Sequence, residues 1–139
     1  MHEWALAEAV VVTAIKTAKE HSFREVTDIE IQLGQLQQID KDVFAFAVEK
    51  ALKSQRLLFK ETKVHFHDEE AVFQCRNCGR EWTFEDNKKK LSTTESEAIH
   101  FVPEVAHAYM GCPDCQSTDF EILKGRGVSV SSITGERDD

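Results

Sequence analysis

Four cysteines in two Cys-x-x-Cys pairs constrain this chain more than any other feature. The pairs are Cys75-Arg76-Asn77-Cys78 and Cys112-Pro113-Asp114-Cys115. Two such pairs allow four thiolates to converge tetrahedrally on one ion, which is a ligand set of structural zinc sites. The 33 residues between them, 79 to 111, exceed the usual ribbon spacing of about 15–20 residues, but loop-closure entropy grows only slowly with length. The pairs therefore predict one Zn(II) ion in a zinc-ribbon module.

Whether paired cysteines form disulfides or bind metal depends on the cellular compartment, and the sequence contains several indications of the compartment. The first residues lack the basic region, apolar run and cleavage site of a secretory signal. No run of about 18 or more apolar residues is present that would span a membrane. The formal net charge of −8 over 139 residues argues against a nucleic-acid partner, because phosphate contact needs a basic face. These features predict a cytoplasmic protein without a membrane or nucleic-acid partner.

Other uses of the cysteine pairs remain alternatives. In a reducing cytosol, paired cysteines are more often metal ligands than disulfides. A thioredoxin-like redox pair opens a helix, whereas both pairs here adjoin strand-like runs. Iron, as in a rubredoxin-like electron carrier, is the main rival metal. Four thiolates fill every coordination position of a tetrahedral ion, which favours structural zinc. A strong visible charge-transfer band of the purified protein would exclude zinc.

Periodicity predicts the elements of the N-terminal half. Apolar residues at helical spacing indicate a helix over 4–20. Strict alternation over 28–33 predicts a half-buried strand that ends at Gly34, and Asp40 is placed to cap a second helix. A further strand is expected over 62–67. The inward residues of the first strand are predicted to be Ile29, Ile31 and Leu33.

The C-terminal half predicts short strands around a long loop. Strand-like runs lie at 71–73, 120–122 and 128–133, and residues 135–139 are expected to fray. The predicted fold class is α+β: a small, mainly antiparallel sheet with two helices, plus a four-cysteine zinc-ribbon (rubredoxin-like) module. The last strand is expected to return to the first sheet. Residues 1–70 and 126–139 would then form one discontinuous domain, and residues 71–125 the other.

The extreme N-terminus offers a second group of metal ligands. The α-amine of Met1, the amide nitrogen and the imidazole of His2 can reach one cation in fused chelate rings, and Glu3 can complete the set. Nitrogen-rich, planar coordination suits Ni(II) or Cu(II), and it requires a free amine and an unprotonated imidazole. From position alone, a solvated terminal histidine is the ordinary interpretation.

Three motifs together resemble one known family. They are Met1-His2-Glu3-Trp4-Ala5-Leu6, Ile29-Glu30-Ile31-Gln32-Leu33-Gly34, and the pairs Cys75-x-x-Cys78 and Cys112-Pro113-x-Cys115. The combination resembles the HypA/HybF family of nickel metallochaperones, which serve the maturation of [NiFe]-hydrogenase and, in some bacteria, of urease. The resemblance implies a nickel domain (1–70 and 126–139) that holds Ni(II) as cargo at His2 and Glu3, beside a zinc domain (71–125). It further implies delivery with a nucleotide-hydrolysing partner, HypB, to the hydrogenase large subunit.

The chain contains no Gly-x-x-x-x-Gly-Lys-[Ser/Thr] phosphate loop and no recognisable catalytic constellation. We therefore expect a non-enzyme whose nucleotide energy comes from a partner. The main alternative function is a zinc-ribbon adaptor in which His2 has no role.

The histidines of the long loop and of the strand at 62–67 are weaker candidates. The loop exceeds that of many family members and contains His100 and His107. His100 is a weaker candidate for a nickel ligand, because its setting, Ile99-His100-Phe101-Val102, more often indicates packing. His65 and His67 point from one strand face, and with Lys63 beside them a solvated surface is favoured over a metal site. Exchange of elements through Gly125 or Gly127 would permit a homodimer, which the residues alone do not decide.

Overall fold

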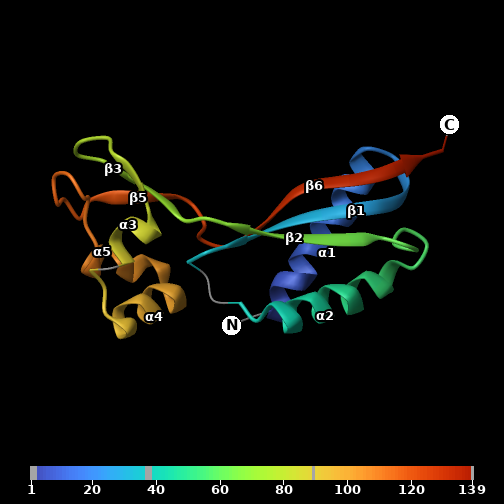
Figure 1. Ribbon diagram of the computed structural model, residues 1–139. Helices are drawn as coiled ribbons and strands as arrows, with labels where there is room; N and C mark the ends of the chain where they lie inside the picture. The colour runs from blue at the N-terminus through green and yellow to red at the C-terminus, as the bar shows by residue number, and fades with distance from the viewer. Residues whose placement is uncertain (1–2, 37–38, 89, 139) are drawn as a thin grey trace. The chain divides into compact units, whose positions relative to one another are not determined.

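A computed structural model describes residues 3–36, 39–88 and 90–138 of the chain. The chain divides into two compact units (Figure 1). Unit 1 comprises Met1–Gln32, Ile39–His67 and Val128–Asp139, and unit 2 comprises Leu33–Gln38 and Asp68–Gly127. Each unit combines helices with a three-stranded sheet, which confirms the α+β fold class. No helix among the described residues is long and apolar enough to cross a membrane.

The sheet of unit 1 has the strand order β2-β1-β6. Its strands are β1 (Phe23–Gly34), β2 (Lys63–Glu69) and β6 (Val128–Arg137). Contacts of His65 with Asp28 and of His67 with Glu30 advance in the same direction along β1 and β2, so this pair is parallel. Arg24 contacts Glu136 and Gln32 contacts Ser131, so the contacts advance along β1 while they go back along β6. The two strands are therefore antiparallel.

Helices α1 (Glu3–Glu20) and α2 (Lys41–Leu52) lie on one side of this sheet (Figure 1). The Asp40 side chain caps α2 by accepting a hydrogen bond of 3.1 Å from the Val43 N–H, as predicted. A 3₁₀ turn (Lys53–Gln55) follows α2. The alternation in β1 is confirmed, because the side chains predicted to point inward are buried: Ile29, Ile31 and Leu33. The opposite face of β1 and β2 is therefore left to polar side chains.

Two strands of unit 1 are longer than predicted. β1 begins at Phe23 rather than near residue 28, and β6 continues to Arg137, so the expectation of a frayed tail from residue 135 is wrong. Cross-strand contacts explain the extension. Arg24 Nη2 donates to Glu136 Oε2 at 2.8 Å, and Arg137 Nε donates to the His21 carbonyl at 2.7 Å.

The sheet of unit 2 has the order β4-β3-β5 with antiparallel neighbours. Its strands are β3 (Val72–Cys75), β4 (Glu81–Thr83) and β5 (Phe120–Lys124). Phe73 is opposite Trp82 on one side and Ile122 on the other. Phe73, Trp82 and Phe120 form an aromatic cluster with ring centroids 5.3–5.6 Å apart. This cluster lies in the buried core that also contains Cys75 and Cys112.

The sequence predicts a long loop between the cysteine pairs, but most of this segment is helical. It contains α3 (Phe84–Lys88), α4 (Thr93–Phe101), a 3₁₀ turn (Pro103–Val105) and α5 (Ala106–Tyr109). Ser92 and Glu95 form a capping box at the start of α4, each side chain accepting a hydrogen bond from the backbone N–H of the other. Ile99, Ala106 and Met110 of this segment reach the core of unit 2.

Gly125, directly after β5, is a point of close packing. Its φ is +86°, and an added Cβ would lie 2.5 Å from the Ala71 Cα. Its N–H donates to Glu69 Oε1 and its carbonyl accepts from the Leu36 N–H, both at 2.8 Å. Only glycine satisfies this conformation and this clearance together.

We expect Gly125→Ala to destabilise unit 2 by about 2–5 kcal/mol, because left-handed strain of about 1–2 kcal/mol adds to overpacking of about 1–3 kcal/mol. Gly79→Ala is the matched control. Gly79 also has positive φ, +80°, but nothing lies within 4 Å of its added Cβ, so only the strain remains. Denaturant unfolding of both variants, followed by Trp82 fluorescence in a Trp4→Phe background, compares them. Equal destabilisation of the two variants would contradict the packing argument.

Candidate metal centre

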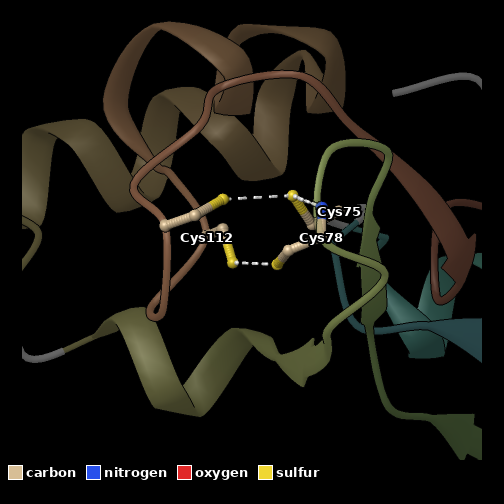
Figure 2. A group of neighbouring side chains, drawn as sticks. Cys75, Cys78 and Cys112 are labelled. Atoms are coloured by element: carbon tan, nitrogen blue, oxygen red, sulfur yellow. Dashed lines mark hydrogen bonds between the residues drawn. The ribbon is translucent and has the colours of Figure 1, made fainter.

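The four cysteine sulfurs of unit 2 converge. All four lie within 4.8 Å of one another, and Cys75–Cys115 and Cys78–Cys112 each have a sulfur–sulfur distance of 3.5 Å. Figure 2 shows the sulfurs of Cys75, Cys78 and Cys112 turned toward one another from two facing loops. A tetrahedron with bonds of about 2.3 Å to zinc has edges of about 3.8 Å. The distances fit that tetrahedron and are too long for a disulfide, whose S–S bond is about 2.05 Å.

Two matching turns position the sulfurs. In the first, the Cys75 N–H donates to the Arg80 carbonyl at 2.8 Å and the Gly79 N–H donates to the Cys75 carbonyl at 3.0 Å. In the second, the Cys112 N–H donates to the Ser117 carbonyl and the Gln116 N–H donates to the Cys112 carbonyl, both at 2.9 Å. Gln116 adopts a φ of +62°, so it takes the left-handed conformation that Gly79 takes in the first turn. The second turn therefore has the same hydrogen bonds and the same left-handed residue as the first, although it has Gln116 in place of glycine.

N–H groups point at the sulfurs from both turns. The Cys78 N–H donates to the Cys75 sulfur and the Asp114 N–H to the Cys112 sulfur, both at 3.4 Å. The Asn77 side chain donates to the Cys115 sulfur across the centre, at 3.5 Å. Donors aimed at sulfur stabilise the thiolate form, which is the form that binds metal.

The sulfurs influence one another's ionisation. The Asn77 hydrogen bond, with help from the Ser117 N–H, lowers the pKa of Cys115 to about 6. At Cys78, a hydrogen bond from the Arg80 N–H lowers the pKa of the thiol. The contact with the Cys112 sulfur, the burial of the thiol and the contacts with the other two sulfurs raise it by more, so the pKa of Cys78 is about 12. Crowded thiolates repel one another, so a cation is needed before all four can ionise. Four sulfur ligands this close together fit Zn(II), which would be held by the four thiolates and would offset their mutual repulsion.

The histidines of the long segment both bind carbonyl oxygens within unit 2. His100, on α4, donates from Nδ1 to the Leu36 carbonyl at 3.1 Å, and its ring meets the edge of Phe84 with centroids 5.4 Å apart. His107, on α5, donates from Nδ1 to the Thr118 carbonyl at 3.0 Å and stacks on Phe120 at 4.2 Å. Each ring thus retains Nε2 as an acceptor when the imidazole is neutral.

The N-terminal candidates are described only in part. Met1 and His2 lie outside the described residues. Glu3 opens α1, and its Oε1 accepts a hydrogen bond of 3.4 Å from the Asp40 N–H, within unit 1. This contact places the Glu3 carboxylate beside the start of α2.

Sequence reasoning missed two groups of polar residues. Asn77 has no motif signal beyond lying between the two cysteines of the first pair. The alternation in β1 predicts only that Asp28 and Glu30 point away from the core, yet they face His65 and His67 across the β1–β2 pair. Cross-strand register, which no local pattern records, creates this cluster.

Comparison with known proteins agrees with the fold and the cysteine centre. A family profile described as "Hydrogenase/urease nickel incorporation, metallochaperone, hypA" matches residues 1–135. The chain is 45% identical to hydrogenase maturation factor HypA of Thermococcus sibiricus over 139 residues, which cover 100% of this chain and 99% of the relative. The chain belongs to the HypA family. Its identity to HypA of Pyrococcus abyssi is 43%, over 100% of this chain and 99% of the relative.

Solved structures of HypA proteins share the fold. The solution structure of the Ni metallochaperone HypA from Helicobacter pylori matches with a TM-score of 0.69 and 17% identity, covering 99% of this chain and 100% of that one. A second HypA solution structure matches with a TM-score of 0.67 and 16% identity, covering 99% of this chain and 98% of that one. As a member of the HypA family, the chain is a hydrogenase maturation factor of the nickel metallochaperone class.

Proposed function

We propose that this HypA-family chain binds Ni(II) at its own N-terminus and delivers it for [NiFe]-hydrogenase maturation, together with a HypB-type nucleotide-hydrolysing partner. The hydrogenase large subunit is the final acceptor in this proposal, and the cytoplasm is its location. The observation that carries the proposal is the family match, which starts at residue 1 and therefore includes Met1-His2-Glu3. The absence of a phosphate loop from the sequence supports assigning nucleotide hydrolysis to the partner and no catalytic step to this chain.

The proposed nickel ligands are the Met1 amine, the His2 amide nitrogen and imidazole, and an oxygen or nitrogen of Glu3. Three nitrogens in fused chelate rings suit the planar coordination that Ni(II) favours. A chain end can be displaced one ligand at a time, which supports capture followed by transfer to an acceptor. The contact of Glu3 with Asp40 supports a defined position for the chelate beside unit 1.

The proposal divides the tasks between two domains. Residues 1–70 and 126–139 form the nickel domain, and residues 71–125 form the zinc domain, with structural Zn(II) on Cys75, Cys78, Cys112 and Cys115. Zinc would fix the two cysteine turns against one another. His100 is a weaker candidate for an additional nickel ligand. This candidate is supported by the hydrogen bond from His100 Nδ1 to the Leu36 carbonyl, because a neutral imidazole with its proton on Nδ1 keeps Nε2 as a basic nitrogen that could bind a metal ion.

A Gly-Ser extension before Met1 tests the N-terminal chelate. The extension converts the Met1 amine into an amide and removes a basic nitrogen, so we expect nickel affinity to fall by a factor of about ten or more, or about 1.4 kcal/mol. Calorimetry with Ni(II) measures the change, and metal analysis should find the zinc content unaltered. The same dipeptide added after Asp139 is the control. Equal nickel affinity of the two extended proteins would refute an amine ligand.

A further inference from the structure

Two ion pairs join the first cysteine turn of unit 2 to the second cysteine turn. Arg80 Nη1 donates to Asp114 Oδ1 at 2.7 Å, and Arg76 Nη1 donates to Asp119 Oδ1 at 3.0 Å. Both arginines belong to the first turn, whereas Asp114 lies inside the second turn and Asp119 lies between that turn and β5. We call these contacts the cross-turn ion pairs. All four residues are in unit 2.

Arg80 connects donors that point at sulfurs of both turns. Its N–H donates to the Cys78 sulfur, and its carbonyl accepts a hydrogen bond of 2.8 Å from the Cys75 N–H. Its guanidinium binds Asp114, whose own N–H donates to the Cys112 sulfur at 3.4 Å. Arg80 therefore links a donor to one sulfur of the first pair with a donor to one sulfur of the second pair.

Arg76 makes a similar connection through Asp119. The Arg76 N–H donates to the Asp119 carbonyl at 3.0 Å, in addition to the contact between the two side chains. The Asp119 N–H donates to Ser117 Oγ at 3.1 Å, and the Ser117 N–H donates to the Cys115 sulfur. The two arginines thus reach, through one aspartate each, the donors to both sulfurs of the second pair.

We propose that Arg76 and Arg80 are positioning residues of the metal centre, which hold the second cysteine turn against the first and slow the loss of zinc. Groups that orient metal ligands through hydrogen bonds have a large influence on metal retention. An ion held by two sulfurs from each turn leaves when the turns separate, and the cross-turn ion pairs oppose that separation. The inference rests on the proposed Zn(II) at the four cysteines. It requires neither the N-terminal chelate nor nickel.

The exposure of the cross-turn ion pairs limits the size of the effect. Their four side chains keep between 40% and 66% of their surface exposed, and solvent weakens ion pairs of this kind. We therefore expect a change in the rate of zinc release from a protein that remains folded. Arg80→Gln should release zinc about three to ten times faster than wild-type protein, at or below the effect typical of groups that orient metal ligands.

Zinc release from the full chain to an excess of a chromogenic chelator measures this rate. The double variant Arg80→Gln with Asp114→Asn should release zinc no faster than Arg80→Gln, because both variants lack the same ion pair. Arg80→Lys keeps the charge and should restore part of the retention. Raising the salt concentration should speed release from wild-type protein more than from Arg80→Gln, since salt screens an exposed ion pair.

Arg24→Gln is the matched control, because Arg24 forms an ion pair of 2.8 Å with Glu136 in unit 1. That variant should release zinc at the wild-type rate. Equal rates for wild-type protein and Arg80→Gln, or additive effects of Arg80→Gln and Asp114→Asn, would overturn the inference. Arg76→Gln gives the same decision if Arg80→Gln does not fold.

Metal analysis before the kinetic measurement separates this inference from the proposed zinc centre. Wild-type protein without zinc would overturn both of them. Normal zinc content with equal release rates would overturn the role of the two arginines alone and leave the four-cysteine centre in place.

Discussion

Replacing Cys75 or Cys112 by serine is expected to abolish zinc binding and to unfold unit 2. The apparent binding free energy of structural zinc is about 10–16 kcal/mol, as large as the whole stability of a typical domain, about 5–15 kcal/mol. Both sulfurs also belong to the buried core beside Phe73 and Phe120, so their loss removes core contacts as well. Metal analysis should find no zinc, and the dispersed NMR signals of Trp82 and Phe120 should collapse while those of Ile29 and Ile31 persist.

Asn77→Ala is the graded control for the cysteine variants. It removes one hydrogen bond to the Cys115 sulfur and leaves all four thiolates in place. We therefore expect zinc to be retained with reduced affinity and unit 2 to stay folded. Retention of zinc and of a folded unit 2 in Cys75→Ser would contradict a structural centre. An intense visible absorption of the purified wild-type protein would identify iron instead of zinc.

His2→Ala is expected to lower nickel affinity by a factor of about 100 or more, or about 2.7 kcal/mol, since each factor of ten is about 1.4 kcal/mol. The change removes the imidazole of the proposed chelate and opens the ring that the imidazole closes with the His2 amide nitrogen. Calorimetry on protein with its native amino terminus measures the loss, and the zinc content should stay unchanged. Nickel affinity should also fall in acid for the wild-type protein, because protons compete for the amine and the imidazole.

The control for this variant is His107→Ala, which removes an imidazole hydrogen-bonded to a carbonyl within unit 2. We expect nickel affinity to be unaltered in that protein. Equal nickel binding by His2→Ala and wild-type protein would remove the N-terminal site from the proposal. The family assignment would stand in that case, because it rests on the match across residues 1–135.

Features with a local chemical cause could be predicted from sequence. The alternation of Ile29, Ile31 and Leu33 follows from the two-residue period of a strand, and the Asp40 cap follows from its position before an apolar helical pattern. The cysteine pairs also carry their geometry locally, because a two-residue spacer forms one tight turn. These patterns sufficed for the fold class and for the convergence of the four sulfurs.

Features with a distant cause could not be predicted in the same way. The length of β1 and β6 depends on pairing between residues more than 100 positions apart, as in the Arg24–Glu136 contact. The cluster of His65 with Asp28 depends on strand register. The long segment is an intermediate case, because Ser92-x-x-Glu95 is a local capping pattern from which α4 could have been predicted.

The strand order β2-β1-β6 has a consequence for how the chain is made. β6, which pairs with β1, leaves the ribosome after all four cysteines and β5. Domains fold as units during synthesis, generally in the order in which they are completed. Unit 2 can therefore acquire its metal while unit 1 still lacks a strand. Synthesis of β6 is the event that completes the sheet of unit 1.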